Sequence, residues 1–322
     1  GAATADSSAL GTVLIPAMVR EGYDKAYAAA LTAVSSVIGP IIPPSIAMII
    51  YGVLSSTSIA KLFLAGIVPG LLLGFSLLGY AWYVAKKRGY PTSPKPPMAE
   101  RAVAVGRAIP ALLLPVIILG GILSGVFTPT ESAAVAVIYA LLVSMLLYRT
   151  LKLREIGKPL GDSVVLTSAI MLIAAVAKMV AIVFAYDSIP SEVAKVLLSI
   201  SDDPIILLLL INAFLLFLGL FLEPLAAMIL ALPVLLEIAG IIGVDKVHFG
   251  IIVVLNLVIG LATPPVGLCL FIVCAIGKVS IEAVSRASLP MLGICVIVLL
   301  LVTFFPDLVL FVPSLFETTI RQ

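Results

Sequence analysis

The chain carries Gly39-Pro-Ile-Ile-Pro43-Pro44 in one apolar run and Gly260-Leu-Ala-Thr-Pro264-Pro265 in another. Proline has no N–H to donate, and its ring clashes with the carbonyl four residues back, so each Pro-Pro pair breaks a helix. Seventeen residues before each glycine lies a shared signal, Gly22-Tyr-Asp24-Lys25 in the first run and Gly243-Val-Asp245-Lys246 in the second. The two regions are therefore interpreted as copies of one unit, repeated at an offset of 221 positions.

The composition requires a lipid environment. Of the 322 residues, 62% are hydrophobic and 11% are charged, whereas soluble domains are roughly half apolar and about a quarter charged. Candidate spans lie at 24–54 (interrupted), 60–86, 108–127, 131–149, 163–188, 246–275 (interrupted) and 288–312. None alternates polar and apolar residues as the strands of a membrane barrel do. The sequence predicts an all-α polytopic membrane protein in a lipid bilayer, and a net charge of +2 argues against a nucleic-acid partner.

Lysine and arginine indicate the direction of the spans, because cytoplasmic loops are rich in them. Lys86-Lys87-Arg88 closes one span, and a second basic loop runs through 149–158. With these loops in the cytoplasm, fourteen of the nineteen basic residues lie inside and four outside. The broken stretch 24–54 then runs outward and 246–275 runs inward, so the two copies have inverted topology. Inverted repeats with paired broken helices are typical of secondary transporters, whose sites lie near the bilayer midplane.

The two breaks are also candidate binding sites. In lipid, carbonyls without hydrogen-bond partners are costly, so a break persists only inside protein or beside a wet cavity. Freed carbonyls and helix C-termini suit a small cation such as Na⁺, and helix N-termini beyond the break suit a carboxylate. Ser45 follows one Pro-Pro pair and Thr263 precedes the other, so each adds a hydroxyl. The alternative is a plain proline kink, but two breaks at repeat-related positions favour an ion site.

Several single residues carry further expectations. Lys178 interrupts an apolar span, so it either contacts an anionic substrate or snorkels or pairs with a carboxylate. Asp24 and Asp245 begin the broken stretches and are predicted to cap their N-termini. The segment Gly66–Gly74 has glycine at every fourth position, which predicts close helix packing or a subunit contact.

Motifs extend along the whole chain around the breaks. They are Gly11-Thr-Val-Leu-Ile-Pro16-Ala-Met, Gly22-Tyr-Asp24, the stretch 29–45, His248-Phe-Gly250 and the stretch 256–268. Together they resemble the large membrane subunit of TRAP (tripartite ATP-independent periplasmic) transporters. The resemblance implies Na⁺-coupled import of an organic anion, such as a dicarboxylate or sialic acid, across the bacterial inner membrane. A periplasmic binding protein would deliver the substrate, and a small membrane subunit, separate or fused, would complete the complex.

The resemblance also implies an elevator-type fold with re-entrant hairpins. The residues alone allow the arms 205–222 and 225–241 to cross twice or to turn back, and the resemblance makes them a hairpin with its tip at 219–224. The chain's start, 1–11, then resembles the tip and second arm of a first hairpin, whose first arm is expected to precede it. Ala2 stands where family members usually carry a serine, so a hydroxyl expected there is replaced.

The predicted organisation follows the two repeats. Residues 1–54 end the first hairpin and form the first broken helix, and 55–162 form scaffold spans with a cytoplasmic linker at 89–107. Residues 163–204 form a span and a periplasmic amphipathic segment, and 205–241 form the second hairpin. The second broken helix is 242–275, and the final scaffold span is 276–322.

The site prediction combines the breaks with the hairpin tips. The predicted Na⁺-binding residues are Asp6, Ser36, Gly39, Pro43, Ser45, Gly219, Glu223, Asn256, Gly260, Thr263 and Pro264. The predicted substrate-binding residues are Pro44, Pro265 and Lys178. Asp6 and Glu223 would equally serve as helix N-caps. The coupling ion is the only cofactor expected, and transition-metal sites are not.

The sequence favours a transporter over other classes of function. The chain has no HExxH, GxSxG or intramembrane aspartate pair, so no catalytic residue is predicted. An ion channel or an uncoupled anion carrier would use the same broken-helix sites. Saturable flux that requires Na⁺ distinguishes coupled transport from both. A scaffold without transport of its own is disfavoured by two costly breaks in one chain.

Overall fold

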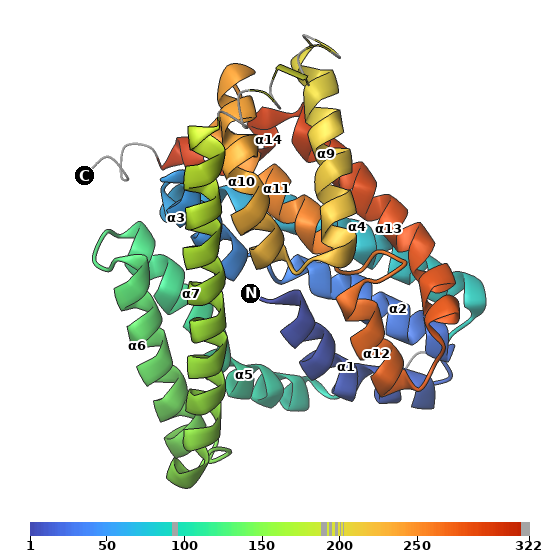
Figure 1. The fold of residues 1–322 in the computed structure, drawn as a ribbon. Coiled ribbons are helices and arrows are strands. Elements are labelled where there is room, and N and C mark those ends of the chain that lie inside the picture. The colour runs from blue at the N-terminus through green and yellow to red at the C-terminus, as the bar shows by residue number, and fades with distance from the viewer. Residues whose placement is uncertain are drawn as a thin grey trace. The chain divides into compact units, whose positions relative to one another are not determined.

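The computed structural model describes residues 1–91, 96–187 and 203–316, together with 192, 195, 196, 199 and 201. Within α7 (Gly157–Tyr186) it describes only the backbone at 173, 174, 177, 178, 181, 184 and 185. Every regular element in this part of the chain is a helix (Figure 1), and six helices are long and apolar enough to cross a membrane. The predicted all-α polytopic membrane protein is confirmed.

The helices form two compact units. The smaller unit contains α5 (Met98–Leu123) and α6 (Pro129–Leu142), which pack on each other. Thr128 caps α6, and Glu131 accepts a hydrogen bond from the Thr128 N–H at 2.8 Å. The larger unit contains α1 to α4 and α9 to α14, and therefore both breaks.

The larger unit is built from two matching series of helices. The first series is α1 (Ala3–Arg20), α2 (Lys25–Ser35, extended by a 3₁₀ turn Ser36–Ile38), α3 (Ile46–Ser55) and α4 (Ile59–Arg88). The second is α10 (Pro224–Ile241), α11 (Lys246–Gly260), α12 (Leu268–Gly277) and α13 (Ile281–Phe304). Both predicted breaks are present, between α2 and α3 and between α11 and α12. α1 and α10 each have 18 residues and begin 221 positions apart.

The two series pack on each other reciprocally. α1 packs on α12, as Figure 1 shows, and α10 packs on α3. Likewise α2 packs on α12 and α13, whereas α11 packs on α3 and α4. Each contact between the two series therefore occurs twice, the second time with both helices replaced by their repeat mates. This is the pattern of a two-fold relation. The packing supports the interpretation of the sequence as a duplication.

Aspartates start both broken helices. Asp24 Oδ1 accepts a hydrogen bond from the Tyr27 N–H at 2.8 Å, and Asp245 Oδ1 accepts from the Val247 and His248 N–H groups at 2.8 and 3.0 Å. These bonds satisfy N–H groups that a helix start leaves unpaired, and a negative charge suits the positive end of the helix. The predicted capping roles are confirmed.

The glycine face of α4 packs on the first break. A Cβ atom on Gly66 would lie 2.5 Å from the Ile41 carbonyl oxygen, and one on Gly70 would lie 2.5 Å from Ile42 Cγ1. Only glycine therefore allows α4 to approach the irregular backbone this closely. The predicted close packing is confirmed, and its partner lies within the chain.

The structure corrects the last span. The predicted helix 288–312 is wrong, because α13 ends at Phe304 and a separate helix, α14 (Pro306–Leu315), follows. Pro306 has no N–H for the helical ladder and disfavours helical backbone at Phe305, whose φ and ψ are −118° and 81°. α14 then packs against α4.

The observed helices and compact units can be set beside three of the predicted boundaries. α5 begins at Met98, within the predicted linker 89–107 and ten residues before the predicted span 108–127. The boundaries at 54/55 and 275/276 do not separate the units, because α4 and α13 pack with α2 and α11 in the larger unit. The assignment of segments to a transport domain and a scaffold stays a prediction.

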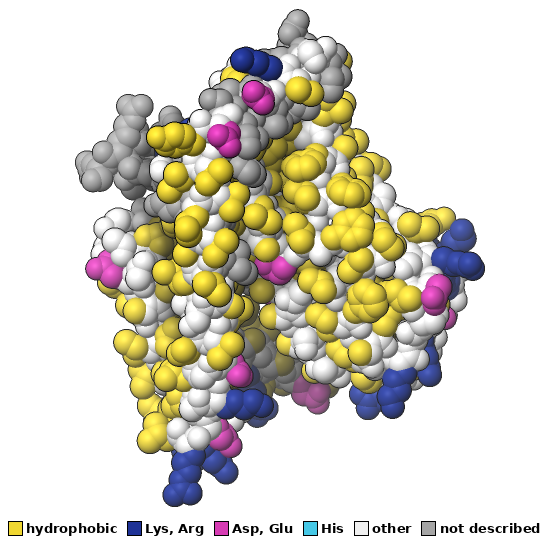
Figure 2. Space-filling view, in the orientation of Figure 1, with side chains coloured by type: hydrophobic (Ala, Val, Ile, Leu, Met, Phe, Trp, Pro, Cys, Tyr) yellow, Lys and Arg dark blue, Asp and Glu magenta, His cyan; other side chains and the backbone are white. Residues whose placement is uncertain are grey.

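The surface of α9 (Pro204–Phe221) is suited to lipid. Ile205, Phe214, Phe217 and Phe221 are each exposed, at 47% or more. Figure 2 shows hydrophobic side chains covering the surface over this helix. A contiguous apolar face of this kind is stable in hydrocarbon and costly in water.

Candidate functional site

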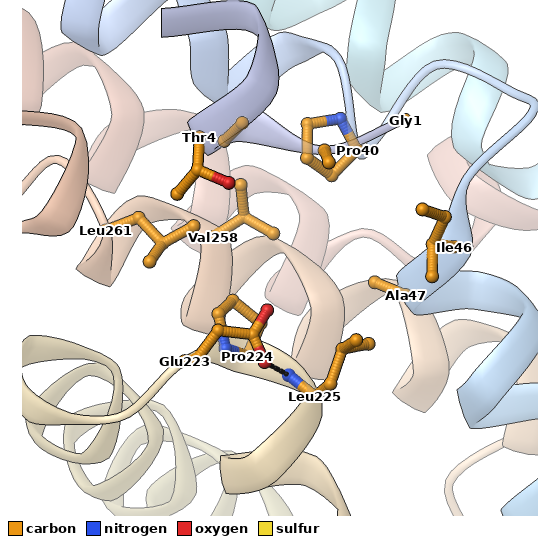
Figure 3. Close-up of a pocket in the computed structure, with 12 residues that line it drawn as sticks. Gly1, Thr4, Pro40, Ile46, Ala47, Glu223, Pro224, Leu225, Val258 and Leu261 are labelled. Atoms are coloured by element: carbon orange, nitrogen blue, oxygen red, sulfur yellow. Dashed lines mark hydrogen bonds between the residues drawn. The ribbon is translucent and has the colours of Figure 1, made fainter. Parts of the chain in front are cut away.

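A cavity of about 50 Å³ lies where the two repeats meet. Its walls come from the start of α1, the first break, the turn between α9 and α10, and the end of α11; they include Thr4, Pro40, Ala47, Glu223 and Val258. In Figure 3 the Thr4 hydroxyl and the Glu223 carboxylate approach the cavity from opposite sides. A site for one water needs about 10–15 Å³, so the cavity has room for a few waters or a partly hydrated ion.

Three helix N-termini open on this cavity. α1 begins at Ala3, α3 at Ile46 and α10 at Pro224, and all three residues line the wall of the cavity. Helix N-termini carry positive partial charge and point N–H groups at a ligand, so their convergence suits a carboxylate. Ser45 Oγ caps α3 by accepting from the Met48 N–H at 3.2 Å, whereas no described side chain caps α1.

Asp6 lies against the first break. A Cβ atom on Gly39 would overlap the Asp6 Oδ2 atom and would lie 3.1 Å from its Cγ. Glycine at 39 therefore leaves the space that the half-buried carboxylate occupies. Ser36 begins the 3₁₀ turn just before this contact. The structure thus brings three of the predicted Na⁺-binding residues together.

The second break also has a close contact, with the end of α9. A Cβ atom on Gly260 would collide with the carbonyl carbon of Gly219 and would lie 2.6 Å from its oxygen. One on Gly219 would lie 3.1 Å from the Leu257 carbonyl oxygen. The end of α9 and the second break therefore meet backbone to backbone, and two more predicted residues are neighbours.

The predicted hydroxyl groups all have local partners. Ser36 Oγ donates to the Thr32 carbonyl and Thr263 Oγ1 donates to the Ile259 carbonyl, each at 2.7 Å. Because their hydrogens are used, the oxygen lone pairs of both side chains stay available to a cation. Ser45, which already accepts a hydrogen bond, is less suited to this role.

The sequence matches the family described as "Tripartite ATP-independent periplasmic transporter, DctM component" over residues 1–308. The chain belongs to this family. It is 44% identical over 316 residues to the sialic acid TRAP transporter large permease protein SiaM of Vibrio cholerae, covering 98% of this chain and 74% of that relative. It is 41% identical to the C4-dicarboxylate TRAP transporter large permease protein DctM of Pseudomonas aeruginosa, with coverages of 98% and 74%. Identity to the sialic acid TRAP transporter permease protein SiaT of Haemophilus influenzae is 40%, with 98% and 51% covered.

Membership of the DctM family agrees with the helices described above. The family is a component of a transporter rather than an enzyme, and this chain is a multi-pass protein of the bacterial inner membrane. No group of three or more His, Cys, Asp or Glu side chains that would hold a metal ion occurs among the residues whose placement is described.

Glu223 has the capping role that was one of its two predicted alternatives. Its Oε2 accepts hydrogen bonds from the Leu225 and Ala226 N–H groups, at 2.8 and 3.4 Å, at the start of α10. Figure 3 shows the bond to Leu225 and the carboxylate at the wall of the cavity. The cap leaves Oε1 without a part in these bonds, so the residue can hold α10 and present negative charge.

The cap at Glu223 is expected to contribute to the stability of the protein. Glu223→Ala removes both acceptor bonds and is expected to lower the free energy of unfolding by about 1 kcal/mol. Glu223→Gln keeps an acceptor oxygen, so its loss is expected to be smaller. Thermal unfolding of the purified variants measures both. Equal losses in the two variants would contradict a role for the acceptor oxygen.

The prolines and Lys178 complete the predicted set. In both breaks the peptide bond between the prolines, Pro43-Pro44 and Pro264-Pro265, is cis. The Pro44 carbonyl oxygen lies 2.7 Å from the position of a Cβ on Gly1, beside the cavity. The side chain of Lys178 lies outside the described part of the chain, so its predicted substrate contact stays a prediction.

Asn256 lies on α11 but does not line the cavity. Its Nδ2 donates to Asn212 Oδ1 at 2.6 Å and to the Ile252 carbonyl at 2.8 Å. Sequence reasoning missed Asn212 and Thr4, which lines the cavity. The signal for Asn212 was present, because it is the one side chain in 204–221 that bears a hydrogen-bonding group.

Proposed function

We propose that this chain forms the ion- and substrate-binding part of a large TRAP permease subunit that imports a small organic anion together with Na⁺. The proposal is supported by relatives named for sialic acid, C4-dicarboxylates and isethionate. All three are small anions that carry a carboxylate or sulfonate. The substrate class proposed here is therefore a small carboxylate or sulfonate.

The observation that carries the proposal is the convergence of three helix N-termini on the cavity between the repeats. Backbone N–H groups bind an anionic group without contacting the rest of the substrate, and those at the start of α1 have no described side-chain cap. The Asp6–Gly39 and Gly219–Gly260 contacts lie at the two breaks, where carboxylate, carbonyl and hydroxyl oxygens suit Na⁺. A cation beside the site offsets the charge of the substrate, which is the physical basis proposed for coupling.

The partners belong to the proposal as well. We expect a periplasmic binding protein that delivers the anion and a small membrane subunit, separate from this chain or fused to it. We also expect elevator-type movement of the domain that carries the breaks. The inverted, reciprocally packed repeats support this mechanism, because such repeats are typical of alternating-access transporters.

Uptake by the complete transporter tests the proposal. Proteoliposomes containing the membrane complex would receive a labelled dicarboxylate or sialic acid, with or without the binding protein, under an inward gradient of Na⁺ or of K⁺. We expect saturable uptake only with Na⁺ and the binding protein. Flux that is indifferent to Na⁺ and does not saturate would instead favour a channel or an uncoupled anion carrier.

A further inference from the structure

A chain of hydrogen bonds links three helices of the larger unit through buried side chains. Asn256 on α11 donates to Asn212 Oδ1 on α9 at 2.6 Å, and Asn212 Nδ2 donates to Thr303 Oγ1 on α13 at 2.9 Å. Thr303 Oγ1 in turn donates to the Leu299 carbonyl at 2.8 Å. The three side chains are each 3% exposed or less. We call the side chains of Asn212, Asn256 and Thr303 the polar ladder.

α9 packs extensively on α11, and the ladder is one of two specific contacts within that interface. The other is the contact between the Gly219 and Gly260 backbones. Asn212 and Gly219 are separated by two helical turns, about 10 Å along α9. Two fixed points at this separation set both the rotation of α9 and its position along α11. α9 ends at Phe221, shortly after the second point, and the turn that carries Glu223 follows.

Hydrogen bonds are needed for this purpose because the surroundings are apolar. Every other side chain of α9 is a hydrocarbon or aromatic group, and lipid competes equally well for such surfaces. Hydrogen bonds between polar side chains form only in one register, so they specify the position that apolar packing leaves open. Asn256 Oδ1 is already buried without a hydrogen-bond partner among the described residues. Loss of Asn212 would leave the amide of Asn256 and the Thr303 hydroxyl with fewer partners still.

We propose that Asn212 is a positioning residue for Na⁺ coupling. Through the polar ladder it holds Gly219 against Gly260, so that the end of α9 and the second break present their oxygens at one place. This inference rests on the proposed function, since it names the residue that sets the geometry of the second Na⁺ site. It assigns no ion contact to Asn212 itself.

Three variants test the ladder in the complete transporter: Asn212→Leu, Thr303→Val and the double variant. In Na⁺-driven uptake we expect Asn212→Leu to raise the half-saturating Na⁺ concentration about tenfold, the effect of leaving buried polar groups unpaired. The maximal rate at saturating Na⁺ should stay within about twofold, because binding is weakened and the path is intact. The double variant should resemble Asn212→Leu alone, since Thr303 acts through Asn212.

Ser288→Ala is the matched control. Ser288 is a fully buried hydroxyl on α13, the helix that carries Thr303, and it donates only to the Ser285 carbonyl of its own helix. Its removal should leave the half-saturating Na⁺ concentration unchanged. A shift equal to that of Asn212→Leu would show that any buried hydroxyl or amide has this effect, and it would overturn the proposal.

Hydrogen–deuterium exchange gives a readout that does not depend on transport. We expect Asn212→Leu to accelerate exchange of the amides in 219–223, with those of α1 unchanged. A lower melting temperature with unaltered Na⁺ dependence and unaltered exchange at the turn would reduce the ladder to a structural role and overturn the proposal. If Asn212→Leu does not fold, Thr303→Val, which preserves side-chain volume, is judged by the same two readouts. Wild-type transport without Na⁺ dependence would refute the proposed function, and the exchange experiment would still decide the positioning.

Discussion

Gly260→Ala is expected to abolish uptake and to destabilise the protein. The new methyl group would meet the backbone of Gly219, its carbonyl carbon and, at 2.6 Å, its Cα and oxygen. The backbone atoms of Gly219 belong to helix α9 and cannot rotate away as a side chain can, so α9 and α11 would have to separate. Overpacking of this kind typically costs about 1–3 kcal/mol, and separation would also open the second break. Thermal unfolding and Na⁺-driven uptake of the purified complex measure the two effects.

Gly293→Ala is the control for this change. Gly293 lies inside α13, and a Cβ atom there would meet nothing within 4 Å. Alanine favours helix over glycine by about 1 kcal/mol, so stability should stay equal or rise and uptake should be retained. If Gly260→Ala behaved like Gly293→Ala, the close contact between the end of α9 and the second break would be refuted.

Gly39→Ala is expected to impair Na⁺ coupling while the protein stays folded. Here the new methyl group would occupy the place of the Asp6 Oδ2 atom, which belongs to a side chain that can rotate. The carboxylate would be displaced from the first break, and the stability cost should be below about 1 kcal/mol, the size of an off-rotamer adjustment. We expect the half-saturating Na⁺ concentration to rise about tenfold or more, the effect of a lost charged ligand group.

A double-variant cycle separates displacement from a general disturbance of the break. Asp6→Ala alone should raise the half-saturating Na⁺ concentration as Gly39→Ala does. The pair of changes should then be no worse than either one, because both remove the same carboxylate from the same place. Additive effects would mean that Gly39→Ala acts on the backbone of the break rather than on Asp6.

Local chemistry made much of the fold predictable. The Pro-Pro pairs end helices wherever they stand, aspartate caps the N–H groups that follow it, and span length follows from hydropathy. Asp24, Asp245 and both breaks were therefore found correctly from neighbours in the sequence. The final span was wrong because its apolar composition runs on past Pro306, although that proline is itself a local signal.

The sequence by itself determined the repeat, the breaks and the membrane class, since each is written in residues that are near one another or in a fixed offset. Only the tertiary structure decided which residues meet: Asp6 with Gly39, Gly219 with Gly260, and Asn212 with Thr303. These pairs are separated by 33, 41 and 91 positions, so no local pattern contains them. Their contacts depend on how whole helices rotate and slide against one another, and that is settled by packing all helices of the unit at once.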